Sequence, residues 1–368
     1  MISISLCMIV KNEEEVLGRC LESVGPVADE IIILDTGSTD RTKEIARQFT
    51  DKVYDFTWQG DFAAARNAAF LKATKEFWLW LDADDVLPKA EQEKLLALKK
   101  RLTVLDADVV MMQYATSFDE AGNPTFRFRR ERLIKNIHRP VWEGRVHEVV
   151  APFGRILHED ITVYHKKLRV ADPDRNLNIY RDMEAKGQPF SARELYYFGR
   201  ELFYHRLWQE ATERFEAFLR RKDGWLPDQL EACRLRSAAF DELGEEEKAL
   251  EALLEGLKLS VPRGELCCAL GYHFLQQNRL AEAIFWYEAA FRTKLDKNFG
   301  GFVQEECYHY LPAIQLCLCY DRQGNWKEAQ KWNDVAKSFR PQSDAVKWNE
   351  AYFAKKRKEE ETICIVTE

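Results

Sequence analysis

The sequence predicts an α/β domain with a parallel sheet, followed by an all-α domain built from helical repeats. In residues 1–115, short apolar runs alternate with segments of helical spacing, a pattern typical of βαβ units with right-handed crossovers. From about residue 190 onward, similar helical segments follow one another. With 368 residues, 46% of them hydrophobic, the chain is long enough for two domains that each bury a core.

Apolar runs and helical spacing define the elements of the first domain. The expected strands are residues 2–10, 30–35, 52–56 and 77–82. The expected helices are residues 13–24, 39–49, 61–74 and 90–102. Ser38 or Thr39 is expected as the N-cap of the second helix, since both residue types accept hydrogen bonds from backbone N–H groups there.

The pattern changes at residue 108. Residues 108–118 and 125–134 predict a β-hairpin with a turn at 119–124. A loop-rich segment, "HRPVWEGRVHEVV", covers 138–150, and a last strand is expected in "DITVYHKKLR" at 160–169.

The second domain is expected to repeat a pair of helices. One alanine recurs in register in four copies, at spacings close to the ~34 residues of tetratricopeptide repeats (TPRs) with insertions. The positions that carry this register are Ala211, Ala249, Ala283 and Ala329, with Gly199 and Gly271 in the preceding helix and Phe215, Leu253 and Tyr287 four residues after the alanine. Pro341 ends the last copy. An irregular helical bundle is the alternative. The predicted parts are 1–170, a linker at 171–190, repeats at 191–350 and a tail at 351–368.

Composition narrows the function. The net charge of -7, from 54 basic and 61 acidic residues, argues against a nucleic-acid partner, and the "KKRK" run at 355–358 is expected to be a solvated helix face. No apolar run reaches the ~18 residues of a membrane span. The nine cysteines match no paired zinc pattern and are expected to be mostly buried free thiols in the cytoplasm.

The stretch "FWLWLDADD" at 77–85 ends a buried strand in three clustered acids, Asp82, Asp84 and Asp85. Like charges this close repel one another, so a cation is expected among them. Asp35 ends the second strand, and ligands of open α/β sheets bind beyond such carboxyl ends. Mn²⁺ or Mg²⁺ bound to a diphosphate suits an Asp-x-Asp turn. Helix-capping acids are the alternative.

The ordered segments "MIVKNEEEVLGRCLESV", "DEIIILDTGSTDRTKEIARQF", "DFAAARNAAFLKATKEFWLWLDADD" and "WEGRVHE" closely resemble family 2 glycosyltransferases of the GT-A (Rossmann-like) fold, over roughly residues 1–170. Followed by helical repeats, they look like two groups. One is the lipopolysaccharide-core glucosyltransferase-like enzymes, and the other is the sublancin-type peptide S-glycosyltransferases.

The resemblance implies a hexosyltransferase that uses a nucleotide-sugar. Asp35 would bind the base, Val10, Asn12 and Glu13 would line base and ribose, and Arg66 would reach the nucleotide or diphosphate. Asp82 would face the ribose or sugar, and Trp142 could flank the sugar. For Arg66 a surface arginine is the alternative, and for Trp142 a buried aromatic.

The resemblance also implies a metal and a general base. Asp84 would hold the metal, and Asp85 would lie behind it. His165 is a second metal ligand by a partial match, with a structural histidine as the alternative. In inverting enzymes of this fold the base is an acid in the "WEGRVHE" region. We expect Glu148, with His147 positioning it or contacting the donor and Glu143 in reserve.

Several functions are compatible with this pattern. The first is inverting transfer, from a UDP-sugar in our expectation, to a peptide or protein side chain recruited by the repeats. A lipid-linked or cell-envelope glycan is the alternative acceptor. A non-catalytic TPR scaffold is the alternative of another class, and the repeats could also form a homodimer. A nucleotidyltransferase would require a Gly-rich basic loop after the first strand, where this chain has "KNEEE".

Overall fold

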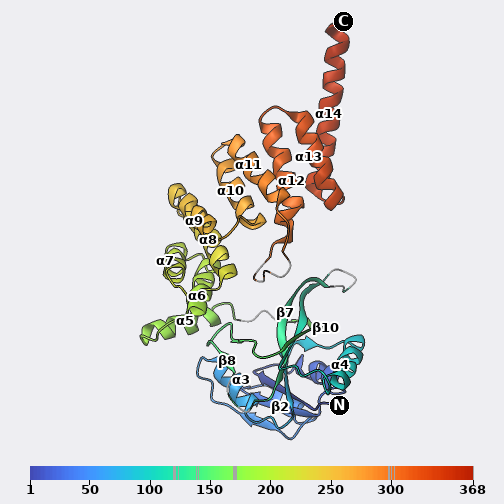
Figure 1. The fold of residues 1–368 in the computed structure, drawn as a ribbon, viewed down its shortest axis with the longest axis vertical. Helices are drawn as coiled ribbons and strands as arrows, with labels where there is room; N and C mark the ends of the chain where they lie inside the picture. Colours follow the sequence, from blue (N-terminus) through green and yellow to red (C-terminus); the bar gives the residue numbers. More distant parts are fainter. Residues whose placement is uncertain are drawn as a thin grey trace. The chain divides into compact units, whose positions relative to one another are not determined.

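The computed structural model describes residues 1–118, 122, 124–137, 139, 141–168, 172–296, 299, 301 and 303–367. The chain divides into two units, Met1–Pro189 and Phe190–Glu368 (Figure 1). The first is an α/β unit and the second is all-helical, which confirms the predicted fold class.

Within its described residues, the first unit contains an eight-stranded sheet in the order β3-β2-β1-β4-β7-β6-β10-β5 and a two-stranded sheet, β8-β9. The strands are β1 Ile4–Val10, β2 Glu30–Asp35, β3 Val53–Asp55, β4 Phe77–Trp80, β5 Asp85–Val86, β6 Val109–Phe118, β7 Pro124–Lys135, β8 Trp142–Glu143, β9 Val149–Val150 and β10 Ile156–His165. The helices are α1 Leu17–Val24, α2 Thr42–Ala46, α3 Phe62–Phe70, α4 Lys89–Arg101 and α5 Arg175–Ala185.

One half of the large sheet is parallel and the other is mixed. Strands β3, β2, β1 and β4 pair in parallel, as the βαβ pattern predicted. The predicted hairpin is confirmed as the antiparallel pair β6–β7, and β7 also pairs antiparallel with β4. The hairpin thereby places residues from 109–135 beside the end of β4.

Side chains alternate along the strands, and helices cover both faces of the parallel half of the sheet. In β1, Leu6 and Met8 join the core formed with α1 and α4, and Cys7 joins the core formed with α3. In β4, Trp78 and Trp80 pack toward the Ala-rich α3, whose small side chains allow the indole rings to lie close.

Three predicted helices, α1, α2 and α3, are shorter than expected, and the predicted N-cap of α2 is wrong. Helix α2 begins after Arg41, with no capping side chain, because Ser38 and Thr39 are used elsewhere. Ser38 Oγ accepts from the Asn12 backbone N–H, and Asn12 Oδ1 accepts from the Thr39 N–H. Helix α3 ends early since Thr74 bonds to Glu30 and directs the chain toward β4.

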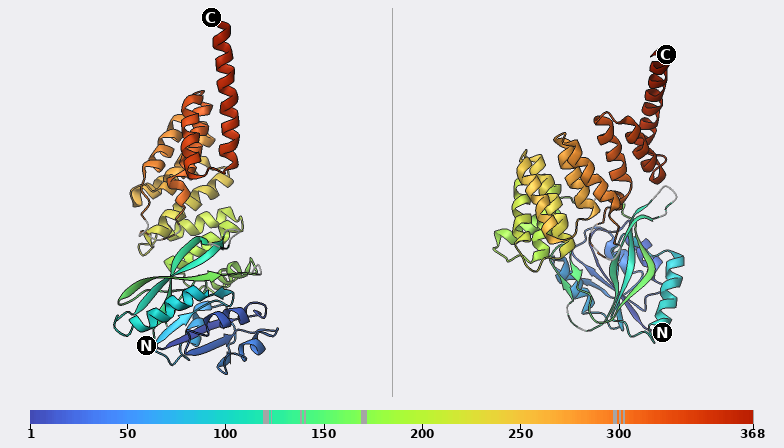
Figure 2. Two further views of the ribbon diagram at one scale, coloured as in Figure 1. Left: turned by 90° about the vertical axis from the view of Figure 1, so that its right-hand side faces the viewer. Right: turned by 45° about the horizontal axis from the view of Figure 1, so that its top comes forward.

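In the second unit the described residues form four consecutive helix pairs that lie side by side in chain order (Figures 1 and 2). The pairs are α6 Ala192–Tyr204 with α7 Trp208–Leu219, α8 Leu226–Glu242 with α9 Glu246–Leu259, α10 Gly264–Gln276 with α11 Leu280–Arg292, and α12 Tyr310–Arg322 with α13 Trp326–Phe339. A short 3₁₀ helix, η1 Glu305–Tyr308, precedes α12, and α14 Asp344–Thr367 follows the last pair.

The repeat register predicted from the sequence agrees with the packing. All four register alanines are completely buried. A Cβ atom at Gly199 would lie 2.8 Å from Phe215, and one at Gly271 would lie 2.9 Å from Tyr287. Glycine is therefore required where an aromatic ring of the second helix lies against the first.

The segment 351–368, expected as a tail, is helical up to Thr367 because α14 continues through it. Val346 and Phe353 anchor the start of this helix in the core of the last pair. Helix α5 lies within the expected linker 171–190. The predicted turn at 119–124 falls largely outside the described residues, as do residues 170 and 171 at the predicted boundary and Glu368. Among the described residues, none of the helices has the length and apolar character needed to cross a bilayer.

Candidate active site

The predicted site residues gather at the carboxyl ends of the parallel strands, as expected for an open α/β sheet. Val10 and Asp35 are paired in register at the ends of β1 and β2. Asp82 and Asp84 follow β4 directly. Strand β10 adds His165 from the mixed half of the sheet, where it pairs with Asp85 of β5.

Asp35 has one carboxylate oxygen engaged and one free to bind. Oδ1 accepts from the backbone N–H groups of Gly37 and Ser38, at 3.0 and 2.9 Å. Oδ2 is buried and has no hydrogen-bond partner within the described part of the chain. A buried polar atom without a partner is rare in native proteins, and here it lies beside the loop of Asn12, whose φ of +55° is left-handed.

Arg66 on α3 joins two of the predicted acids. Its Nε donates to Glu148 Oε1 at 2.6 Å, and its Nη2 donates to Asp82 Oδ1 at 2.8 Å. The guanidinium lies 4.8 and 5.0 Å from the rings of Trp80 and Trp142. With a side chain only 8% exposed, Arg66 is not a surface arginine.

Asp82 is held as a carboxylate by this environment. Burial alone would raise its pKa, but the charges of Arg66 and Arg132 outweigh burial and lower the pKa to about 2. Asp82 is therefore ionised over the whole physiological pH range.

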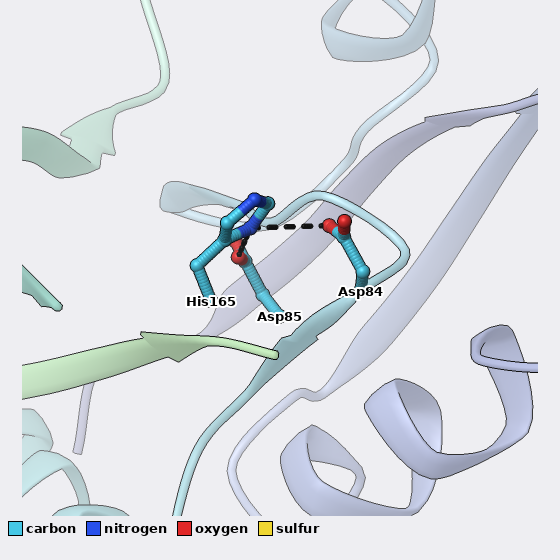
Figure 3. Close-up of side chains that lie close together, drawn as sticks. All are labelled: Asp84, Asp85 and His165. Atoms are coloured by element: carbon cyan, nitrogen blue, oxygen red, sulfur yellow. Dashed lines mark hydrogen bonds and ion pairs between the residues drawn. The ribbon is translucent and has the colours of Figure 1, made fainter. Parts of the chain in front are cut away.

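Asp84, Asp85 and His165 form a second cluster (Figure 3). His165 Nδ1 lies 3.2 Å from Asp84 Oδ1 and 3.2 Å from Asp85 Oδ1. Burial opposes protonation of the imidazole, yet its hydrogen bonds to the two carboxylates raise the His165 pKa to about 10. The cluster attracts positive charge, and oxygen donors with one imidazole suit Mg²⁺ or Mn²⁺. These residues therefore fit a divalent cation.

Strand β8 and the segment that follows it carry the remaining predicted residues. Glu148 meets Arg66, as described above. His147 has a left-handed φ of +53°, which lets the turn bring Glu148 toward α3. Glu143 is exposed. Trp142 is buried against Phe70 and Trp80, as its alternative interpretation expected.

The sequence interpretation missed two residues near the cluster of Asp84, Asp85 and His165. They are Tyr114 on β6 and Arg132 on β7. Tyr114 donates to Asp85 Oδ1 at 3.0 Å, and Arg132 forms an ion pair with Asp85 Oδ2 at 3.2 Å. A charged residue inside the strand-like run "RERLI" was the available signal, since a buried charge requires a partner.

Comparisons with known proteins bear on the family of this chain. Residues 5–162 match the family model "Glycosyl transferase family 2". A TPR repeat-containing protein of Synechococcus elongatus is 31% identical over 87% of this chain and 74% of its own length. The glycosyltransferase SunS of Bacillus phage SPbeta is 30% identical over 54% of this chain. The lipopolysaccharide core biosynthesis glycosyltransferase LpsC of Rhizobium meliloti is 29% identical over 42% of this chain.

The matches cover 49% of SunS and 58% of LpsC, so this chain spans only about half the length of these two relatives. Among solved structures, MamA (20% identity, 50% of this chain and 92% of that chain) and the TPR protein YrrB (17% identity, 49% and 84%) both align with a TM-score of 0.37. At this TM-score neither similarity bears on the function of this chain.

Proposed function

We propose that the sugar donor of this protein is a nucleotide-sugar, a UDP-sugar in our expectation. The premise is that the chain belongs to glycosyl transferase family 2 and is a glycosyltransferase with C-terminal TPR-like repeats. The observation that carries the proposal is the meeting of Asp84 with His165 beside the Arg66–Asp82–Glu148 network. An unpaired buried Asp35 oxygen lies at the end of β2, which is separated from β4 by β1.

The nucleotide would lie along the carboxyl ends of β1 and β2. Asp35 Oδ2 would accept from a base N–H, which would satisfy its missing hydrogen bond. Val10, Asn12 and Glu13 would line the base and ribose. Asp82 would face the ribose or sugar with its orientation fixed by Arg66. Because the Trp142 ring is buried, this residue would act by supporting Arg66 unless the segment around β8 moves.

Asp84 and His165 would hold Mn²⁺ or Mg²⁺, which when bound stabilises the charge of the departing nucleoside diphosphate. Arg66 would add a fork of donors near the phosphates if it exchanged one of its carboxylate partners for the donor.

Transfer would be a single in-line displacement with inversion. The acceptor atom bonds to the anomeric carbon while the bond from that carbon to the diphosphate oxygen breaks, and the electron pair leaves with the diphosphate. Glu148 would accept the acceptor's proton as general base. Its carboxylate is already oriented by Arg66, whereas the exposed Glu143 has no such support. His147 would position Glu148 through the turn that both share.

The acceptor would be a peptide or protein side chain recruited by the helical repeats, since stacked repeats offer extended binding surfaces. A glycan acceptor is the second candidate, supported by the name of LpsC. The connected arrangement of Asp84, Arg66 and Glu148 disfavours a degenerate domain that serves only as a scaffold. The eight described cysteines are all free and buried, which supports the cytoplasm as its location. A homodimer through the repeats stays a prediction.

Calorimetric titration of UDP, GDP and CDP, with and without Mn²⁺, tests the donor site. We expect one nucleotide to bind in a metal-dependent manner to the intact chain. Asp84→Ala should abolish the metal dependence, and Asp160→Ala, which removes an exposed acid from β10, should retain it. Hydrolysis of the matching nucleotide-sugars would then identify the sugar. Absence of binding by every nucleotide, with and without Mn²⁺, would contradict the proposal.

A further inference from the structure

The Asp85 carboxylate is fully occupied by protein partners. Its Oδ1 accepts from the Tyr114 hydroxyl at 3.0 Å and lies 3.2 Å from His165 Nδ1. Its Oδ2 accepts from the Asp82 backbone N–H at 3.0 Å and lies 3.2 Å from Arg132 Nη1. A carboxylate offers about four lone-pair sites, so these four contacts leave Asp85 without a site for a metal ion.

Asp84 differs from its neighbour in each of these respects. Its side chain is 20% exposed, whereas that of Asp85 is completely buried. Its carboxylate has one contact within the described residues, the one to His165. Although Asp84 and Asp85 lie equally close to the imidazole, only Asp84 keeps oxygen lone pairs for an incoming cation.

Arg132 is placed for this pairing by an irregularity of the sheet. Met111 pairs with Glu131 and Val110 pairs with Leu133, so Arg132 is an extra residue of β7 without a partner on β6. Such bulges redirect a side chain and are frequent next to active sites. The redirected guanidinium is completely buried.

The surroundings of Arg132 hold it firmly. Its guanidinium lies 3.8 Å from the Trp80 ring centroid and 4.2 Å from that of Tyr114, and Nη1 donates to the Trp80 carbonyl at 3.1 Å. A metal ion bound by Asp85 would have to use oxygens that already face the fixed positive charge of Arg132. Pairing with Arg132 and ligation of a metal are thus competing uses of one carboxylate.

We propose that Arg132 and Tyr114 are positioning residues that clamp Asp85, and that the clamped Asp85 orients His165 toward a divalent cation held by Asp84 and His165. A carboxylate partner of a metal-ligating histidine fixes the orientation of its ring, and loss of such a partner typically weakens metal binding about 10- to 100-fold. The inference rests on the proposed metal site and assigns to Asp85 the role of a support and not of a ligand.

Direct Mn²⁺ binding to the intact chain, measured by electron paramagnetic resonance without nucleotide, tests the clamp. Tyr114→Phe removes one hydroxyl and should weaken Mn²⁺ binding about 10-fold. Tyr308→Phe is the matched control, because that hydroxyl also donates to a buried carboxylate, Glu265 in the second unit, and its loss should leave Mn²⁺ affinity unchanged.

Two further comparisons separate a support from a ligand. Asp85→Asn should weaken Mn²⁺ binding about 10- to 100-fold. The effects of Asp85→Asn and Tyr114→Phe should be less than additive, because Tyr114 donates to Asp85 and its hydroxyl also lies 2.8 Å from His165 Nδ1. Arg132→Lys, which keeps the charge, should bind Mn²⁺ more tightly than Arg132→Gln.

The outcomes distinguish this inference from the proposed function. Wild-type Mn²⁺ affinity in Asp84→Asn would overturn the metal site itself. Loss of binding in Asp84→Asn, together with wild-type affinity in Tyr114→Phe or additive effects in the double variant, would overturn only the clamp. Because Tyr114→Phe deletes a single atom, the test stands even if the Arg132 variants fail to fold.

Discussion

Replacing Arg66 by Met should destabilise the first unit by about 3 kcal/mol. Among the described residues, only Arg66 forms an ion pair with Glu148. The Glu148 side chain is 13% exposed, so without Arg66 its negative charge would be buried and unpaired. Removal of one partner of a buried ion pair typically costs about 3–5 kcal/mol. Asp82 is 35% exposed, and water would replace its lost bond at a cost below about 1 kcal/mol.

The size of the Glu148 contribution can be isolated with a second substitution. In the Arg66→Met background, Glu148→Gln removes the stranded charge and should recover about 2 kcal/mol, since a neutral amide is far cheaper to bury than a carboxylate. The two substitutions should therefore be strongly non-additive. Arg101→Met is the control. That arginine is 54% exposed and pairs with Glu159, so its loss should cost less than about 1 kcal/mol.

Hydrogen exchange at increasing urea concentrations suits the measurement, because peptides from each unit report separately and a chain of two units has no single unfolding free energy. Peptides from α3 and β4 should lose protection at lower urea in Arg66→Met, and peptides from α10 should be unaffected. An Arg66→Met cost under 1 kcal/mol, or additivity with Glu148→Gln, would refute the ion-pair account.

Two further predictions concern stability. Gly271→Ala should lower the melting temperature of the repeats by an amount equivalent to about 1 kcal/mol, because the steric clash with Tyr287 outweighs the better helix propensity of Ala. The control is Gly18→Ala. Its new Cβ would lie 3.7 Å from Ile45, so this substitution should not be destabilising. Glu30 should make unfolding acid-sensitive. Burial alone would raise its pKa, but hydrogen bonds from Lys52, Ser5 and Thr74 lower it from 4.5 to about 2. A lowered pKa stabilises the fold above about pH 4.5, and this contribution of about 3 kcal/mol is lost as the pH falls through 2. Glu30→Gln should flatten the pH dependence of unfolding between pH 5 and 2; an unchanged slope would contradict it.

Elements with a strong local signal could be predicted from the sequence. Strand β2 has the predicted bounds, because the run at 30–35 is both apolar and flanked by polar residues. The position of β7 between β4 and β6 could not be predicted, since strand pairing is decided by contacts distant in the sequence. The N-cap of α2 was missed for a similar reason. Ser38 and Thr39 bond to Asn12, 26 and 27 residues away, and not to their own helix.

In the candidate site, too, local motifs could be predicted from the sequence and contacts between distant segments could not. Resemblance to family motifs directed attention to Asp84, Arg66 and Glu148, but it gave no indication that Arg66 bridges two acids. Arg132 was invisible because its direction depends on a bulge, and a one-residue change of register moves a side chain to the other face of a strand. Roles that depend on register require the structure.

The charges at the end of β4 explain how three acids are tolerated so close together. Asp82 is matched by Arg66, and Asp85 is matched by Arg132, so two of the three negative charges are neutralised by arginines whose protonation never changes. No arginine pairs with Asp84 within the described residues. The protein thus leaves Asp84 uncompensated by arginine, at the place where the proposed divalent cation would bring positive charge. Adding an arginine partner to Asp84 would, on this reasoning, abolish metal binding while leaving the fold intact.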